Sequence, residues 1–164
     1  MKISSPAFEN GGTIPQTFTC DGKNESPPLV FSEIPEGTKS LVLIMHDPDA
    51  PAGDFTHWLV YSIPPTVKGL PRNLPKKPVL EKGILQGVND FGFVGYGGPC
   101  PPPWDGPHRY YFELYALDYE PNLKPGATRE EVERALEGHV IENATLMGRY
   151  KRTKPFMFGK LSSP

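Results

Sequence analysis

Four residues with acid–base or hydrogen-bonding side chains lie at the ends of three strongly apolar segments: Asp47, His57, His108 and Tyr110. A carboxylate beside an imidazole fixes the tautomer of the ring and favours its charged form. Two imidazoles and a phenol together offer hydrogen bonds that suit an anion such as phosphate. These residue types therefore predict an anion-binding site, one that needs neither a strong base nor a nucleophile.

The first of these residues follows a predicted central strand. Residues 40–46 form a nearly continuous aliphatic run, which is typical of a strand covered on both faces. Asp47 continues the face of this strand that carries Leu41, Leu43 and Met45. The segment that follows contains Pro48, Asp49 and Pro51 and is predicted to form a rigid turn, with Asp49 stabilising the turn and Asp47 serving the site.

A second predicted strand, residues 56–63, brings His57 to the same place. Regular alternation divides its side chains between two faces, with His57, Leu59, Tyr61 and Ile63 on one face and Trp58 and Val60 on the other. The connection from Asp47 to His57 has the length of a loop and no helical pattern. The two strands are therefore predicted to be antiparallel neighbours, with Asp47 and His57 close together at one rim.

A third predicted strand, residues 109–117, carries the other two residues. His108 and Tyr110 fall on the face of Phe112, Leu114 and Ala116, whereas Arg109 lies on the opposite face and is predicted to form a structural ion pair. The preceding loop, residues 95–103, is too rich in glycine and proline to continue a sheet. We expect backbone N–H groups of this loop to approach the anion, as in other glycine-rich loops.

Length and composition indicate a single domain, residues 1–164, with no need for extra cross-links. A formal net charge of −2 with mixed signs gives no reason to expect a nucleic-acid partner. The N-terminus lacks the apolar core of a signal peptide, and the longest apolar run is too short to span a bilayer, so we expect a cytoplasmic protein without a transmembrane segment.

The remaining segments predict a mainly β protein with little helix. Short strands joined by turns are expected over residues 1–39, near Ala7-Phe8, residues 17–19 and residues 29–31, and residues 64–82 are expected to be a long exposed connection without chemistry. Thr128 and Glu131 form a capping box before a helical pattern that extends to Val140. Residues 142–150 fit either a further helical turn or a final strand.

The sequence resembles the phosphatidylethanolamine-binding proteins, which include Raf kinase inhibitor protein, and it looks most like their prokaryotic branch. The resemblance rests on three motifs: DPDAP from Asp47, HWLVYSIP from His57, and NDFGFVGYGGPCPPPWDGPHRYYFELYALD from Asn89. It implies a β-sandwich of antiparallel sheets with one or two peripheral helices near the C-terminus.

The resemblance also implies a function and a site. The anion pocket of the family falls on Asp47, His57, His108 and Tyr110, and the adjoining loop contributes Gly98, Pro99, Cys100 and Pro101. The implied role is that of a non-enzymatic binding or regulatory protein for a phosphate-containing or other small anionic group. Partner proteins would be engaged at the pocket rim, and no cofactor or metal is expected.

Three other functions remain open at this point. The chain could inhibit a protease or a kinase through the pocket rim. It could be a hydrolase with Cys100 as nucleophile, His57 or His108 as base and Asp47 as orienting group. The same aspartate and histidines could instead bind zinc or iron.

Two further predictions concern the cysteines and the oligomeric state. Cys20 and Cys100 lie in loops that both resemble family motifs, so we expect them to approach each other or the pocket; the alternative is two unrelated free thiols. A homodimer is expected from the prokaryotic appearance of the sequence and from three apolar residues in segments predicted to be exposed: Phe55, Phe156 and Phe158.

Overall fold

A computed structural model describes residues 1–152 and shows two antiparallel sheets and one α-helix. The small sheet has the order β1-β2-β5, formed by Lys2–Ser4, Leu29–Ser32 and Gly69–Leu70. The large sheet has the order β6-β4-β3-β7-β8, formed by Leu85–Gln86, Phe55–Ile63, Ser40–Asp47, His108–Leu117 and Val140–Tyr150. The helix α1 spans Arg129–Leu136, and two short 3₁₀ helices span Gln16–Phe18 and Glu81–Gly83. The predicted mainly β fold is confirmed.

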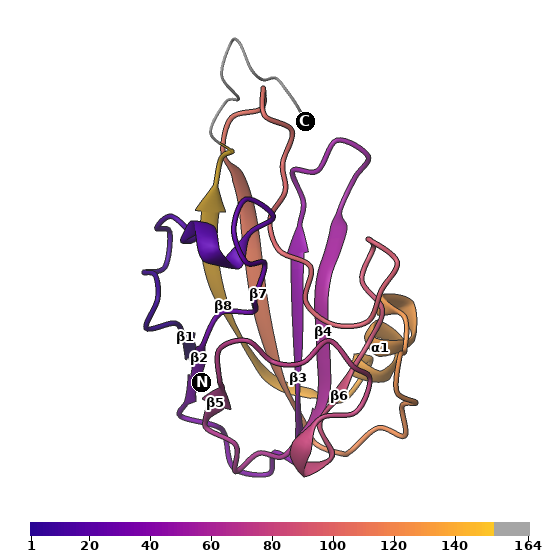
Figure 1. The fold of residues 1–164 in the computed structure, drawn as a ribbon. Coiled ribbons are helices and arrows are strands. Elements are labelled where there is room, and N and C mark those ends of the chain that lie inside the picture. Colours follow the sequence, from indigo (N-terminus) through magenta and orange to yellow (C-terminus); the bar gives the residue numbers. More distant parts are fainter. Residues whose placement is uncertain (153–164) are drawn as a thin grey trace.

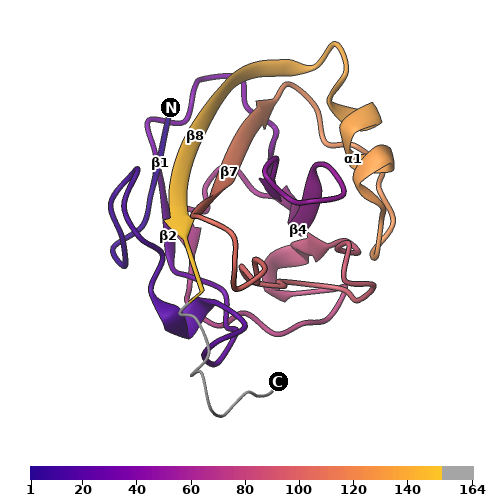
Figure 2. The ribbon, with the colours of Figure 1, turned by 90° about the horizontal axis from the view of Figure 1, so that it is seen from above.

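The large sheet is buried on both faces in its centre, which explains the continuous aliphatic run of β3. One face packs against the small sheet and its loops, and the other packs against α1. Figures 1 and 2 show the strands of the large sheet between β1 and β2 on one side and α1 on the other. Leu41, Leu43 and Met45 lie in the first core, whereas Val42 and Ile44 lie in the second. Every second residue of β3 therefore enters the same core, as predicted.

Two register shifts in β4 overturn the predicted faces of that strand. Met45 pairs with Trp58 and His46 with Thr56, so β4 has one extra residue, His57, at this point. A second shift follows where Leu43 pairs with Val60 and Leu41 with Ile63. Such β-bulges break the simple alternation of side chains. His57 therefore lies on the face of Trp58 and Val60, and the prediction that it shares a face with Leu59 and Tyr61 is wrong.

The C-terminal part confirms the helix and resolves the ambiguous segment. The side chain of Thr128 accepts a hydrogen bond from the Glu131 N–H, and the Glu131 side chain accepts one from the Thr128 N–H. The helix ends at Leu136, and Gly138 follows with a φ of 77°, a conformation that glycine adopts readily. Val140 begins β8 and does not extend the helix. Residues 142–150 are thus strand, because they pair with β7 along its length.

The earlier part of the chain departs from prediction in four places. Residues 29–31 are strand as expected, but residues 17–19 overlap a 3₁₀ helix and Ala7-Phe8 lies in a turn that forms only an isolated bridge. Strand β1 was not predicted. The connection 64–82 is not simply exposed, because it contributes β5 with its buried Leu70. Within residues 1–152, no helix is long and apolar enough to cross a membrane.

Candidate functional site

A carboxylate–imidazole–carboxylate arrangement lies where β3 ends and β7 begins. The two strands pair antiparallel, so the last residue of β3, Asp47, comes beside the first residues of β7. His108 Nδ1 donates to Asp47 Oδ2 at 2.7 Å, and His108 Nε2 donates to Asp105 Oδ2 at 2.9 Å. An imidazole that donates from both nitrogens is the charged imidazolium form. The predicted support of a charged histidine by Asp47 is therefore present in the structure.

The environment of His108 favours the protonated, charged form of its imidazole. Burial alone lowers the pKa of this imidazole, but the hydrogen bonds and negative charges of Asp105 and Asp47 outweigh it and raise the pKa above its ordinary value. His108 and Asp47 are both almost fully buried. Asp105 was not among the residues predicted for the site, although the segment from Pro103 to Asp105 was expected to lie beside the pocket from the family resemblance. Its loop folds back through a bond from the Asp105 N–H to the Pro102 carbonyl.

The environment of His57, unlike that of His108, favours the neutral form of the ring. Its Nδ1 lies 2.6 Å from the carbonyl oxygen of Gly97, so this nitrogen donates and carries the proton of the neutral ring. Burial lowers the pKa of His57, and the Gly97 carbonyl and the charge of Asp47 oppose this only in part. His57 Nε2 has no hydrogen-bond partner among residues 1–152. It is therefore a free acceptor in the neutral form of the ring.

Aromatic rings surround His57. The centroids of Phe55, Phe91 and Tyr110 lie 4.9, 5.4 and 5.2 Å from the centroid of its imidazole. Burial, together with the negative charge of Asp47, raises the pKa of Tyr110 well above its ordinary value, so the phenol keeps its proton. Neither Phe55 nor Phe91 was predicted to join the site, because no local pattern shows that the start of β4 and the loop of Phe91 come together here.

These side chains line one cavity of about 210 Å³. Its lining residues come from the ends of β3, β4 and β7 and from the adjoining loops: Asp47, Ala50, Pro51, Phe55, His57, Phe91, Cys100, Pro101, Pro102, His108 and Tyr110. All four residues of the predicted anion site are among them. We call this space the polar cavity after these four side chains, although most of its exposed lining is apolar. Among the lining residues, Asp47 and His108 carry opposite charges that cancel, and Asp105, which holds the other nitrogen of His108, is not part of the lining.

The loop glycines do not form the predicted cradle. The N–H of Gly98 donates to Asn24 Oδ1 at 2.8 Å and that of Gly97 to the His57 carbonyl, so neither is available to an anion. Gly98 and Pro99 are not among the residues that line the polar cavity, whereas Cys100 and Pro101 are. A Cβ on Gly98 would lie 2.3 Å from the Phe18 carbonyl oxygen, which explains the glycine by close packing.

The turn after β3 is held by both aspartates. Asp47 Oδ1 accepts the N–H of Asp49 at 2.8 Å, so Asp47 stabilises the turn as well as holding His108. Asp49 reaches across to β7 and accepts from Arg109 through both carboxylate oxygens, the predicted ion pair. These bonds from Arg109 lower the pKa of Asp49 to about 2. Of the two prolines assigned to the turn, Pro48 lies in it and Pro51 also lines the polar cavity.

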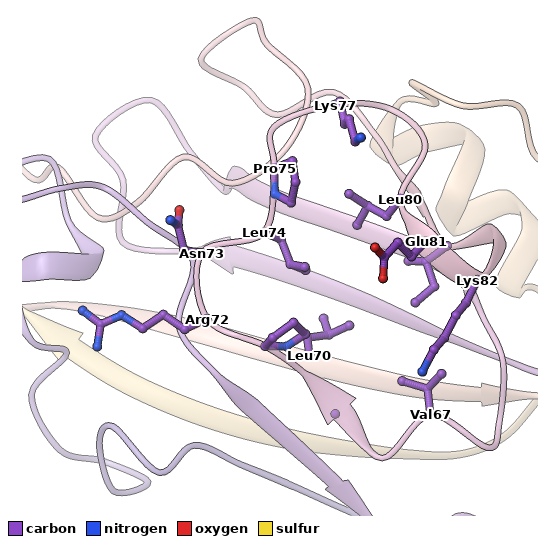
Figure 3. Close-up of a pocket in the computed structure, with 13 residues that line it drawn as sticks. Val67, Leu70, Arg72, Asn73, Leu74, Pro75, Lys77, Leu80, Glu81 and Lys82 are labelled. Atoms are coloured by element: carbon purple, nitrogen blue, oxygen red, sulfur yellow. The ribbon is translucent and has the colours of Figure 1, made fainter.

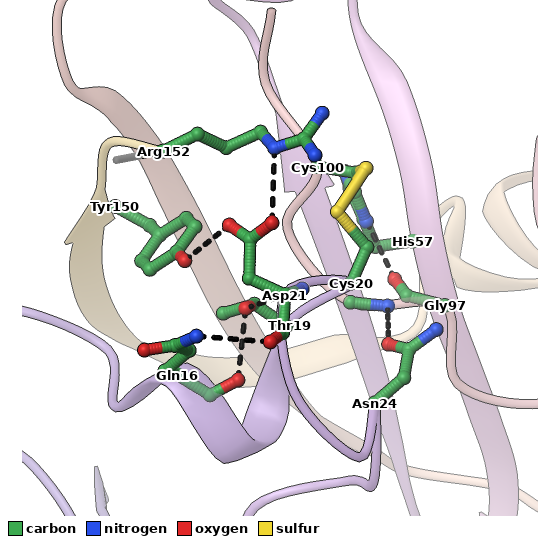
Figure 4. The surroundings of a disulfide bond; sticks show 11 residues. Gln16, Thr19, Cys20, Asp21, Asn24, His57, Gly97, Cys100, Tyr150 and Arg152 are labelled. Carbon is green, nitrogen blue, oxygen red and sulfur yellow. Dashed lines mark hydrogen bonds and ion pairs between the residues drawn. A yellow bond between two sulfur atoms is a disulfide. The ribbon is translucent and has the colours of Figure 1, made fainter. Parts of the chain in front are cut away.

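A disulfide ties the wall of the polar cavity to the N-terminal part of the chain. Cys20 and Cys100 are bonded, with their Cα atoms 5.3 Å apart (Figure 4). Beside them, Asp21 accepts from the Tyr150 hydroxyl at 2.5 Å and from Arg152 Nε at 3.1 Å. The expectation that the cysteines approach each other is confirmed, and the alternative of two free thiols is wrong.

The hypothesis of a hydrolase with Cys100 as nucleophile is therefore wrong, because the Cys100 sulfur is in a disulfide and is not a free thiol. The geometry gives no support to the metal hypothesis. Both nitrogens of His108 are already bonded to carboxylates, and within residues 1–152 no three His, Cys, Asp or Glu residues are placed to hold a metal ion.

The fold and the site define a class: a two-sheet β protein with a small polar cavity where the central strands of its large sheet end. Residues 4–151 match the family model described as phosphatidylethanolamine-binding protein. The chain belongs to this family. It is 52% identical over 153 residues to a UPF0098 protein of Aquifex aeolicus, covering 93% of this chain and 89% of that protein. A UPF0098 protein of Pyrococcus abyssi is 51% identical, with 93% and 85% covered.

Two solved structures show the same fold. A phosphatidylethanolamine-binding protein homolog of Chlamydia trachomatis is 42% identical and superposes with a TM-score of 0.84, covering 92% of this chain and 97% of that one. Escherichia coli YbcL, described as a new member of the mammalian PEBP family, is 35% identical with a TM-score of 0.86, covering 93% and 98%. The sandwich expected from the resemblance is thereby confirmed.

Proposed function

We propose that the polar cavity binds a small oxyanion that carries a proton of its own, such as the monoanion of a phosphate monoester. The observation that carries this proposal is the free acceptor His57 Nε2 in a cavity that is also lined by the acceptor Asp47 and whose ionised lining groups cancel. A fully deprotonated anion would face unpaired acceptors, which is costly in a buried site. A P–OH group can donate to His57 Nε2 or to Asp47.

The donors for the remaining oxygens of the ligand come from this chain. The Tyr110 hydroxyl keeps its proton, and because a hydrogen bond to Asp47 contributes to its raised pKa, a ligand oxygen competes with Asp47 for this donor. The Cys100 N–H has no acceptor among residues 1–152 and lies in the cavity wall. His108 supplies a fixed positive charge nearby, although its N–H groups are occupied by Asp47 and Asp105.

We further propose a binding or regulatory role and no turnover. Its support is that residues 1–152 place no activated nucleophile at the cavity: both cysteines are in the disulfide, and both nitrogens of His108 are held by carboxylates. A protein partner at the rim is consistent with the indole of Trp104, which is 79% exposed in the loop that carries Asp105. Incubation with phosphate monoesters should release no phosphate, and release that Asp47→Asn abolishes would contradict this part.

Two earlier predictions remain predictions. A homodimer was inferred from three phenylalanines, of which Phe55 packs against His57 and Phe91, while Phe156 and Phe158 lie outside the described residues. A cytoplasmic location was inferred from the N-terminal sequence. The disulfide weighs against a reducing compartment, with the intracellular proteins of hyperthermophiles as a recognised exception.

The proposed ligand class is tested by calorimetric titration with methyl phosphate and methanesulfonate between pH 5.5 and 8. Methyl phosphate should bind best as its monoanion and weaken as pH rises through its second ionisation, which lies near 6. Methanesulfonate has no proton to donate, so its binding should be weaker and improve only when His57 becomes protonated, below its ordinary value of 6.5. An affinity for methyl phosphate that stayed constant or rose between pH 5.5 and 8 would contradict the proposal.

Two variants distinguish an effect on the binding site from an effect on the turn after β3. Asp47→Asn should weaken methyl phosphate binding by at least about tenfold, because charged hydrogen bonds contribute about 1.5–3 kcal/mol. Asp49→Asn removes the same charge two residues away, outside the cavity lining, and should leave the affinity nearly unchanged. Equal losses in both variants would mean that the turn, and not the site, controls binding.

A further inference from the structure

A second cavity, of about 380 Å³, is formed by residues of the segment 67–84 and shares no lining residue with the polar cavity (Figure 3). Its apolar lining comes from five side chains that also pack on the main core: Val67, Leu70, Leu74, Leu80 and Ile84. The volume falls within the range of roughly 300–1,000 Å³ that is usual for sites of small organic molecules. The polar cavity falls below this range.

The walls of this second cavity are fixed by buried polar side chains. Ser26, which is 1% exposed, accepts the N–H of Leu74 through its hydroxyl and that of Asn73 through its carbonyl. Gln86, also 1% exposed, donates from its side chain to the carbonyls of Pro75 and Lys77. Two proline rings, at positions 71 and 75, further restrict the backbone. The cavity is therefore preformed, which lowers the entropic cost of filling it.

The charges at its rim favour an anion. Arg72 is already engaged, since its Nε donates to Glu25 at 2.6 Å. Within residues 1–152, Lys77 and Lys82 form no ion pair, and neither does Glu81. Two ammonium groups and one carboxylate leave a net charge of +2 − 1 = +1 around the apolar floor. Figure 3 shows the Lys82 side chain lying along the rim with its ammonium group directed towards Val67.

We propose that this cavity binds a medium-chain aliphatic carboxylate, with the alkyl chain on the floor and the carboxylate at Lys82. An alkyl chain suits a preformed apolar floor, and a single negative charge matches the net charge of the rim. A buried methylene group contributes about 0.8 kcal/mol, which corresponds to about a fourfold gain in affinity. Affinity should therefore rise steeply from hexanoate to octanoate to decanoate until the floor is covered.

Calorimetric titration below the micellar concentration tests the ligand class with decanoate, decanol and decyltrimethylammonium as probes. Decanoate should bind saturably and more tightly than the neutral and cationic probes of equal chain length. Lys82→Ala should weaken decanoate binding by about two- to fivefold, the range for a solvent-exposed charge pair, without affecting decanol. Lys68→Ala is the matched control, because Lys68 is exposed and adjoins the segment but does not line the cavity.

A second variant tests the floor. Val67→Phe places a larger ring at the edge of the cavity and should reduce the affinity for decanoate and decanol alike, while a thermal melt checks that the variant is folded. His57→Ala should leave decanoate binding unchanged, so the result does not depend on the function proposed for the polar cavity. The proposal is overturned if decanoate does not saturate, if decanol binds as tightly, or if Lys82→Ala and Lys68→Ala behave alike.

Discussion

Removing the Cys20–Cys100 disulfide is the perturbation from which we expect the largest loss of stability. The bond joins residues 80 positions apart, so it restricts nearly half of the unfolded chain. In the chain-entropy account, a loop of this length corresponds to about 4.5 kcal/mol at 25 °C, and native disulfides typically contribute about 2–4 kcal/mol. We therefore expect the free energy of unfolding to fall by about 2–4.5 kcal/mol in the variant Cys20→Ser/Cys100→Ser.

Urea unfolding of the oxidised protein and of this double variant measures the difference. The melting temperature should fall by roughly 5–15 °C, given a shift of about 2–4 °C per kcal/mol for a chain of this size. The m-value should rise in the variant, because the unfolded chain without the cross-link exposes more surface. Thiol counting in denatured, unreduced protein should first find no titratable thiol.

The wild-type protein kept in a dithiol reductant is the control, because it lacks the bond but keeps both cysteines. Its stability should match that of the double variant. A loss below 1 kcal/mol with an unchanged m-value would refute the reasoning, since it would mean that the cross-link restricts neither the unfolded chain nor the native loop.

Three further predictions follow from the site. Asp105→Asn removes one carboxylate from His108, so the raised pKa of His108 should fall in an NMR titration. In wild type this raised pKa contributes stability that is complete below pH 6.5 and is lost as pH rises through the folded-state pKa. The variant should therefore lose less stability than wild type as pH rises above 6.5. An unchanged titration would contradict this. Asp49→Ala breaks a partly exposed pair with Arg109 and should cost less than about 1 kcal/mol at neutral pH. Wild type loses this contribution as pH falls from about 4 towards 2, because the pKa of Asp49 is lowered in the folded protein. A difference in unfolding free energy between wild type and variant that is the same at pH 7 and at pH 2 to 3 would count against the pair. Gly98→Ala should cost about 1–3 kcal/mol by overpacking, and a neutral effect on the melt would show that the close contact relaxes freely.

The sequence predicted the site better than it predicted the strand that carries His57. Strict alternation assigns His57 to the face opposite Trp58, and because Trp58 pairs with Met45, that assignment alone would have separated His57 from Asp47. The bulge at His57 restores their proximity. A bulge of this kind depends on cross-strand pairing and has no marker in the local pattern.

Contacts between residues far apart in the sequence account for the other differences between the predicted and the observed site. Asp105 joins the site because its loop folds back at Pro102, and the N–H of Gly98 is taken by Asn24, which lies 74 residues earlier. By contrast, the helix start at Thr128 and the buried strand β3 rest on local signals, and both were predicted. Local patterns thus specified this helix start and this buried strand, whereas the partners of the loop residues came only from the fold.

The central claim is that an oxyanion binds at His57 in the polar cavity, and NMR of the imidazole nitrogens tests it most directly. In the free protein at pH 7, His57 should be neutral with an unprotonated Nε2, and His108 should carry protons on both nitrogens. Saturating methyl phosphate should shift His57 Nε2 to a hydrogen-bonded state while His46 and His139, which are bonded to carboxylates elsewhere, stay unchanged. Saturable binding that leaves the His57 resonances unaltered would contradict the account.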